Sequence, residues 1–102
     1  MFRPCMGQKS EAESWLEFDL REITGRWVSP EGAPSVRIYR TRTEGYLLEF
    51  TYNNPQAVFR LPIRELCRVR YFDLFGRIGL AYDSRRDVLL LSAYGEYQRA
   101  VE

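Results

Sequence analysis

The residues best suited to chemistry are two aspartates, Asp83 and Asp87, which bracket the sequence Ser84-Arg85-Arg86. Carboxylates at this spacing could bind calcium, or could form a phosphate-binding turn with the two arginines. The same composition is typical of a polar hairpin loop neutralised by its own arginines, and we favour that interpretation. Neither aspartate has an evident apolar surrounding that would raise its pKa, so the pattern does not favour a catalytic dyad.

Other catalytic chemistry has little support in the sequence. The chain contains no histidine, which is the commonest general base and the usual partner of a serine or cysteine nucleophile. Its two cysteines, Cys5 and Cys67, are too few for a zinc site. We therefore expect a non-enzymatic protein with no catalytic residues, no cofactor and no metal ligands.

Fourteen of the fifteen basic residues of the protein are arginine. Along the middle of the chain, arginine and aromatic residues alternate. Arginine, tyrosine and phenylalanine are enriched in the centres of protein interfaces. The alternation predicts an outward-facing interaction surface composed of Arg37, Tyr39, Arg68, Arg70 and Phe72. Such interleaving also occurs in sheets that bind single-stranded nucleic acid. Acidic residues interrupt the basic field, however, and cross-strand charge pairs explain the pattern without a nucleic acid.

The elements that would position these residues begin with one helix. Residues 1–9 resemble a flexible tail, and Ser10 with Glu13 three positions later matches a capping box. Leu16, Leu20 and Ile23 then recur at helical spacing, and Gly25 is a natural stop. The pattern predicts a helix whose apolar stripe lies against the remainder of the protein.

From Gly25 onward the apolar period changes to two, and turn-forming residues recur about every eight to twelve positions. This spacing predicts an antiparallel meander of about eight strands. The predicted strands are Arg26–Ser29, Ser35–Thr41, Tyr46–Tyr52, Ala57–Leu61, Cys67–Leu74, Arg77–Tyr82, Val88–Ala93 and Glu96–Val101. Eight short strands can close into a small barrel, which removes exposed edges. The large inward-facing side chains would fill it: Trp27, Phe50, Phe59, Tyr71, Leu80, Leu89 and Tyr97.

Two short motifs at the ends of the predicted barrel carry a family resemblance. Gly25-Arg26-Trp27 opens the first strand directly after the helix, and Tyr97-Gln98-Arg99 closes the last one. This arrangement resembles the lipocalin and wider calycin pattern, in which a terminal arginine packs across the tryptophan ring. Overall the chain is similar to short lipocalin-like proteins of an uncharacterised Bacteroides-type family. The resemblance implies a bacterial lipocalin-like β-barrel in which Gly25, Trp27 and Arg99 are structural, and it implies no catalytic or binding residues.

Size and charge set the remaining expectations. With 102 residues and a net charge of +1, the chain is predicted to hold one domain, residues 10–102, located in the cytoplasm and not bound to a membrane. The favoured function is an accessory or protein-interaction domain whose partner is another protein or a second copy of itself. The alternatives are a binder of a small hydrophobic ligand with a shallow pocket at the barrel mouth and, ranked third, a nucleic-acid-binding module.

Overall fold

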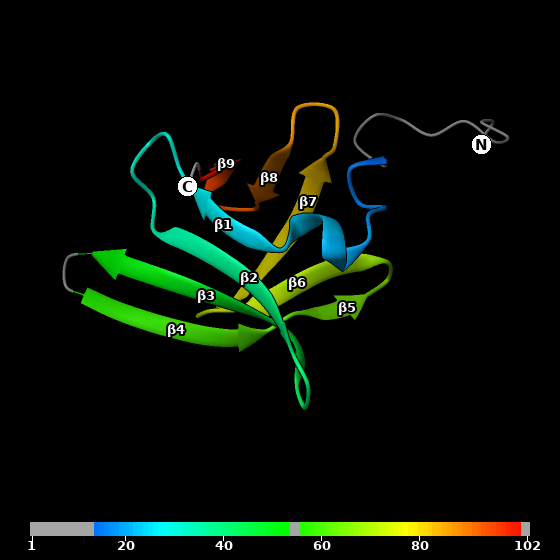
Figure 1. Ribbon diagram of the computed structural model, residues 1–102, viewed down its shortest axis with the longest axis horizontal. Helices are drawn as coiled ribbons and strands as arrows, with labels where there is room; N and C mark the ends of the chain where they lie inside the picture. Colours follow the sequence, from blue (N-terminus) through cyan, green and yellow to red (C-terminus); the bar gives the residue numbers. More distant parts are fainter. Residues whose placement is uncertain (1–13, 54–55, 101–102) are drawn as a thin grey trace, which may run out of the picture.

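The computed structural model describes residues 14–53 and 56–100. This part of the chain forms one short 3-10 helix, η1 (Leu20–Ile23), and nine strands (Figure 1). The strands are β1 (Gly25–Val28), β2 (Ser35–Thr41), β3 (Gly45–Asn53), β4 (Gln56–Pro62), β5 (Arg64–Leu66), β6 (Val69–Asp73), β7 (Arg77–Asp83), β8 (Val88–Leu91) and β9 (Gly95–Arg99).

The strands form one antiparallel sheet in the order β4-β3-β2-β1-β9-β8-β7-β6-β5. The first strand pairs with both β2 and β9, so the two ends of the strand series lie side by side. The sheet therefore curls into a nearly closed barrel in which only β4 and β5 are edge strands. The prediction of a mainly β, antiparallel meander is confirmed.

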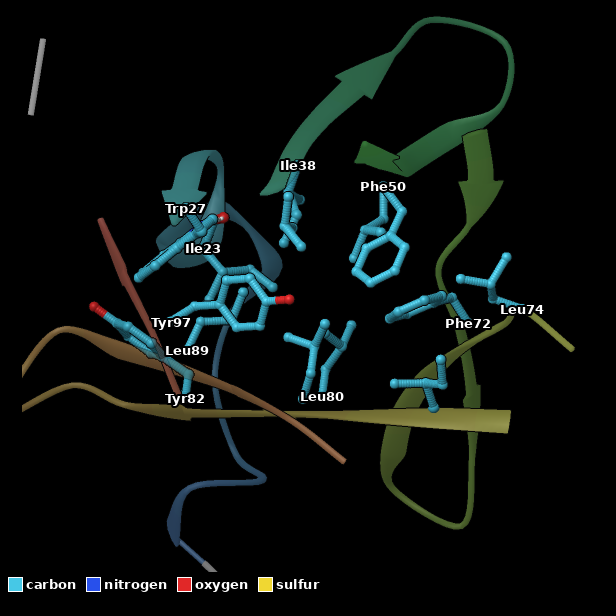
Figure 2. Close-up of a cluster of buried hydrophobic side chains, with 14 of the residues drawn as sticks. Ile23, Trp27, Ile38, Phe50, Phe72, Leu74, Leu80, Tyr82, Leu89 and Tyr97 are labelled. Atoms are coloured by element: carbon cyan, nitrogen blue, oxygen red, sulfur yellow. Dashed lines mark hydrogen bonds between the residues drawn. The ribbon is translucent and has the colours of Figure 1, made fainter. Parts of the chain in front are cut away.

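Alternation of apolar and polar residues decides which side chains enter the barrel. Val36 and Ile38 of β2 are buried, as are Leu48 and Phe50 of the neighbouring β3. Because successive side chains of a strand point to opposite faces, the residues between them face outward. The predicted burial of Trp27, Phe50, Leu80, Leu89 and Tyr97 is confirmed. Figure 2 shows the resulting core, with Trp27 and Tyr82 near one end and Phe50, Phe72 and Leu74 near the other.

The predicted helix is wrong over residues 15–19 of the part of the chain that the structure describes. Ser14 is helical, but residues 15–19 form a turn and an extended segment, and η1 is a short 3-10 helix with one capping box at its start. Asp19 accepts the Arg21 N–H at 2.9 Å, and the Glu22 carboxylate accepts the Asp19 N–H at 3.0 Å. The cause is tertiary: the carbonyl of Trp15 accepts the Tyr82 N–H at 2.8 Å, and a carbonyl inside a helix would be occupied by its own helix. The predicted tail and the Ser10 cap lie outside the described residues.

A second correction concerns the predicted strand Cys67–Leu74, whose first two residues form a turn, so that only β6 (Val69–Asp73) lies within that range. Cys67 and Arg68 have φ values of 53° and 69° and separate β5 from β6. Neither residue type favours this left-handed conformation, so the local sequence does not predict the turn. It also reverses the faces of β6: Phe72 is fully buried opposite Ile78 of β7, whereas Tyr71, predicted to be in the core, faces outward opposite Gly79.

Candidate functional site

One end of the barrel is closed by Trp27 and Arg99. Trp27 is fully buried, and the Arg99 guanidinium carbon lies 4.3 Å from the centroid of its ring. The indole Nε1–H donates to the Ile23 carbonyl at 2.9 Å, so the ring also holds η1 against the barrel. The predicted packing of Arg99 over a buried Trp27 is confirmed.

Arg99 ties three segments together. Its Nε and Nη2 donate to the two oxygens of Asp87 at 2.8 and 3.0 Å, and further bonds reach the carbonyls of Thr24 at 2.7 Å and Glu22 at 2.8 Å. Gly25 has φ +125°, and a Cβ there would lie 3.1 Å from Arg99 Nη1. Glycine is therefore required at this position by both conformation and space. The donors of Arg99 are used within the protein, so this cluster is a structural clasp.

The two aspartates singled out in the sequence are held by arginines. Asp83, which is buried, accepts from Arg86 Nε at 2.7 Å and from the Arg85 N–H at 3.1 Å. The predicted neutralisation within the loop is confirmed for Asp83, but Asp87 pairs with Arg99 on β9. The Arg86 and Arg99 hydrogen bonds respectively hold the pKa of Asp83 and of Asp87 below the usual range. A general acid needs the opposite shift.

The lowered pKa of Asp87 predicts an acid-sensitive clasp. A carboxyl with a depressed folded-state pKa stabilises the protein above its unfolded pKa of about 3.9, and this stability is lost as the pH falls through the folded value. Asp87→Asn should therefore melt below the wild type at pH 7, and the difference should shrink towards pH 3. Thermal melts across this range test it, with the exposed Glu31→Gln as control. A constant difference between Asp87→Asn and the wild type would show that ionisation of Asp87 adds nothing.

The predicted arginine-aromatic interaction face does not exist as one surface. Arg37 and Tyr39 lie on β2, and the Arg37 guanidinium stacks over the Tyr39 ring at 4.5 Å. Both side chains contact Glu49 of β3, at 3.6 Å from Arg37 and 3.3 Å from the tyrosine hydroxyl. Arg60 of β4 donates to the same carboxylate at 3.0 Å. These residues form an intramolecular charge cluster on the outer surface.

The other members of that predicted face do not lie beside Arg37 and Tyr39. They belong to β6 and to the β5–β6 turn, which are separated from β2 in the strand order. Phe72 belongs to the core. Arg70 points to the inner face opposite Leu80, stacks over the Phe18 ring at 4.9 Å and donates to the Phe18 carbonyl. Arg68 lies in the β5–β6 turn, where it and Arg70 line an open groove of about 450 Å³ beside residues 16–19. Four acidic residues, Glu17, Asp19, Glu22 and Glu65, line this groove together with the two arginines, so its charge is mixed.

The end of the barrel opposite the clasp holds a chain of aromatic rings, which we call the aromatic mouth. Ring centroids are 6.0 Å apart for Phe50 and Phe72, 4.9 Å for Phe50 and Tyr94, and 5.4 Å for Phe50 and Tyr52. The series continues outward from Tyr52 to Phe59 at 5.9 Å and from Phe59 to Phe75 at 6.0 Å. The mouth therefore consists of Phe50, Tyr52, Phe59, Phe72, Phe75 and Tyr94, and it leads from the buried core to solvent.

Phe75 is the outermost ring and the least expected residue of the mouth. It lies in the loop between β6 and β7, is 91% exposed and has φ +55°. A left-handed conformation costs a residue with a side chain about 1–2 kcal/mol, and asparagine or glycine is usual there. The ring gains almost no burial in return. The predicted strands leave Phe75-Gly76 as a connection, and the predicted interaction surface does not include Phe75. The available signal was a phenylalanine where a hairpin turn normally has asparagine or aspartate.

The two tyrosines of the mouth can serve as polar contacts. The hydroxyls of Tyr52 and Tyr94 lie 3.4 Å apart. This hydrogen bond, together with burial, raises the pKa of Tyr94 above its usual range. The six residues of the mouth are phenylalanines and tyrosines, so the surface suits an apolar partner with an occasional hydrogen-bonding group.

Comparisons add no relative to this picture: no family model, curated protein or solved structure matches the chain. Among residues 14–53 and 56–100, no group of three or more acidic, histidine or cysteine side chains is placed to hold a metal ion. In the same residues, no helix has the length and apolarity needed to cross a membrane.

Proposed function

We propose that this chain is a non-enzymatic protein-interaction domain and that its aromatic mouth binds an apolar segment of a partner. The observation that carries the proposal is Phe75, an aromatic residue that is strained and solvent-exposed at once. Strained residues of this kind cluster at binding and active sites. Phe59 lies behind Phe75 and supplies a second, half-buried ring that an incoming apolar side chain would contact.

The mouth fits a partner's side chain better than a free small ligand. Phe50 and Phe72 are fully buried and in contact with each other, so the rings fill the interior that a ligand would occupy. Binding sites for small molecules enclose about 300–1,000 Å³ and bury most of the ligand. The exposed rings instead resemble the aromatic anchors found at the centres of protein interfaces.

We further propose that the chain is a lipocalin-like barrel of bacterial origin. The support is the geometry of the clasp: Gly25 leaves room for Arg99, which covers the buried Trp27 and joins the last strand to the first. In this proposal the lipocalin-like scaffold provides the rigid frame, and the mouth at its opposite end provides the contact surface.

Phe75→Asn tests the proposed function because it separates stability from binding. Asparagine tolerates the left-handed conformation, and the ring that is removed was exposed. The free energy of unfolding should therefore rise by about 1 kcal/mol. For a domain of this size the melting temperature should rise by about 4–8 °C. Peptides selected from a displayed random library on the wild-type protein should bind the variant at least about tenfold more weakly, as expected for loss of a central aromatic anchor.

The matched control is Leu66→Asn, which removes another exposed apolar side chain, on β5, away from the mouth. It should leave peptide binding unchanged. Equal peptide binding by wild type and Phe75→Asn would refute the mouth as the contact surface. Saturable binding of one apolar fluorophore per chain, with no peptide selected, would favour the small-ligand alternative instead.

A further inference from the structure

The two edges of the sheet are protected to very different degrees. β5 has only three residues, and two of them, Arg64 and Glu65, are charged and exposed. Short, charged strands are a common protection against pairing with another chain. β4 is the opposite edge, with seven residues, and in the described part of the chain it is hydrogen-bonded only to β3. The β5 edge is therefore protected, whereas β4, although β6 lies near part of it, has a free hydrogen-bonding edge in the described residues.

The outer half of β4 lacks the usual protective residues. Ala57, Val58 and Phe59 are apolar, and Val58 is 53% exposed. The only charged residue of the strand, Arg60, is held by Glu49 of its own sheet at 3.0 Å. Pro62, which cannot donate to a new partner, lies at the end of the strand next to β5 and leaves residues 56–60 unprotected. Figure 1 shows the β3–β4 hairpin projecting beyond the other strands with β4 at the rim.

We propose that a second copy of the chain adds its β4 to this edge, antiparallel and across a twofold axis. An antiparallel strand pair is self-complementary under such an axis, because each contact occurs twice. With Val58 opposite its own copy, Phe59 faces Ala57 of the second copy. With Phe59 opposite its own copy, Arg60 faces Val58 of the second copy. Neither register places like charges opposite each other, whereas a register centred on Arg60 would.

The residues of β4 are thus complementary to a second copy of the same strand in both registers. The proposal uses the free edge and does not depend on partner binding by the aromatic mouth. It also has a structural consequence: opposite residues of an antiparallel pair point to the same face, so the inner faces of the two β4 strands would be continuous. The two aromatic mouths would then lie on the same side of the combined sheet.

Sedimentation equilibrium of the full chain over a range of concentrations tests the inference. The mass should rise from 12.1 kDa towards twice that value as concentration increases. Val58→Lys should raise the dimer dissociation constant at least about tenfold, because like charges directly opposite each other disfavour pairing. In either register the lysine meets a positive charge: its own copy or Arg60 of the second copy. Added salt should partly restore the dimer.

Val28→Lys is the matched control, since Val28 is also an exposed valine, at 42%, but lies on β1 inside the sheet order. It should dimerise as the wild type does. Val58→Glu then reports the register: pairing strengthens if the glutamate faces Arg60 and weakens if it faces its own copy. Circular dichroism confirms that each variant is folded. A wild type that stays monomeric throughout, equal weakening by both lysine variants, or no response to either charge at Val58 would overturn the proposal.

Discussion

Trp27→Ala is expected to remove most of the stability of the domain. The indole is fully buried, and truncating a buried tryptophan to alanine costs about 3–5 kcal/mol. The total free energy of unfolding of a domain of this length is about 5–15 kcal/mol. The substitution also removes the ring beneath Arg99 and the hydrogen bond to Ile23, so the first strand, the last strand and η1 lose their common contact. Chemical denaturation followed by far-ultraviolet circular dichroism measures the loss.

Trp15→Ala is the appropriate control because Trp15 is only half-buried and its contact with Tyr82 is made by the backbone carbonyl. It should lower the free energy of unfolding much less than Trp27→Ala does. Trp27→Phe should fall between the two, since it keeps an aromatic ring under Arg99 but cannot donate to Ile23. Similar losses for both tryptophan-to-alanine variants would mean that Trp27 has no special role in closing the barrel.

Deletion of residues 1–23 is expected to abolish folding, whereas deletion of residues 1–9 should leave the melting temperature almost unchanged. Phe18 and Ile23 are both buried, and each such side chain contributes about 1.5–3 kcal/mol when removed from water. The longer deletion also leaves the Tyr82 N–H without the Trp15 carbonyl and removes the Phe18 ring, which packs edge-on against Tyr82 at 6.1 Å. Melting curves of the purified truncations provide the measurement.

A variant of full length separates packing from chain length. Phe18→Ala combined with Ile23→Ala keeps every backbone hydrogen bond of the segment but removes its two buried side chains. Its free energy of unfolding should fall by about 5–10 kcal/mol, the sum of two large-to-small core substitutions. If the truncation to residue 24 melted at the wild-type temperature, the segment before β1 would not belong to the core.

Local patterns predicted the sheet well where one face of a strand is buried. In β2 and β3 the alternation of apolar and polar residues matches the burial of Val36, Ile38, Leu48 and Phe50, because the side-chain period of a strand is two. The Trp27–Arg99 contact was also predictable, although its residues are far apart in sequence. The resemblance to the calycin pattern implied it, and its physical basis, a cation over an indole face, depends on residue type.

The same reasoning failed where distant groups compete with local preference. Leu16, Leu20 and Ile23 have helical spacing, but the segment instead satisfies Tyr82 through a backbone carbonyl and buries Phe18, which the helical stripe did not include. At Cys67 and Arg68 a left-handed turn forms between residues that do not favour it. Because of that turn, β6 presents the opposite set of side chains to the core from the set predicted. Arg70 and Phe72 point inward as a result, so they cannot belong to an outward-facing interaction surface.

The sequence by itself therefore determined the fold class, the inward residues of the regularly alternating strands and the clasp that joins the barrel's ends. Each of these depends on neighbours along the chain or on the chemistry of particular residue types. Only the tertiary structure decided that Phe75 stands exposed beside Phe59 and that β4 remains an unpaired edge while β5 is protected. The physical reason is that exposure of a ring and pairing of an edge depend on which distant strand lies alongside, and no local period encodes that choice.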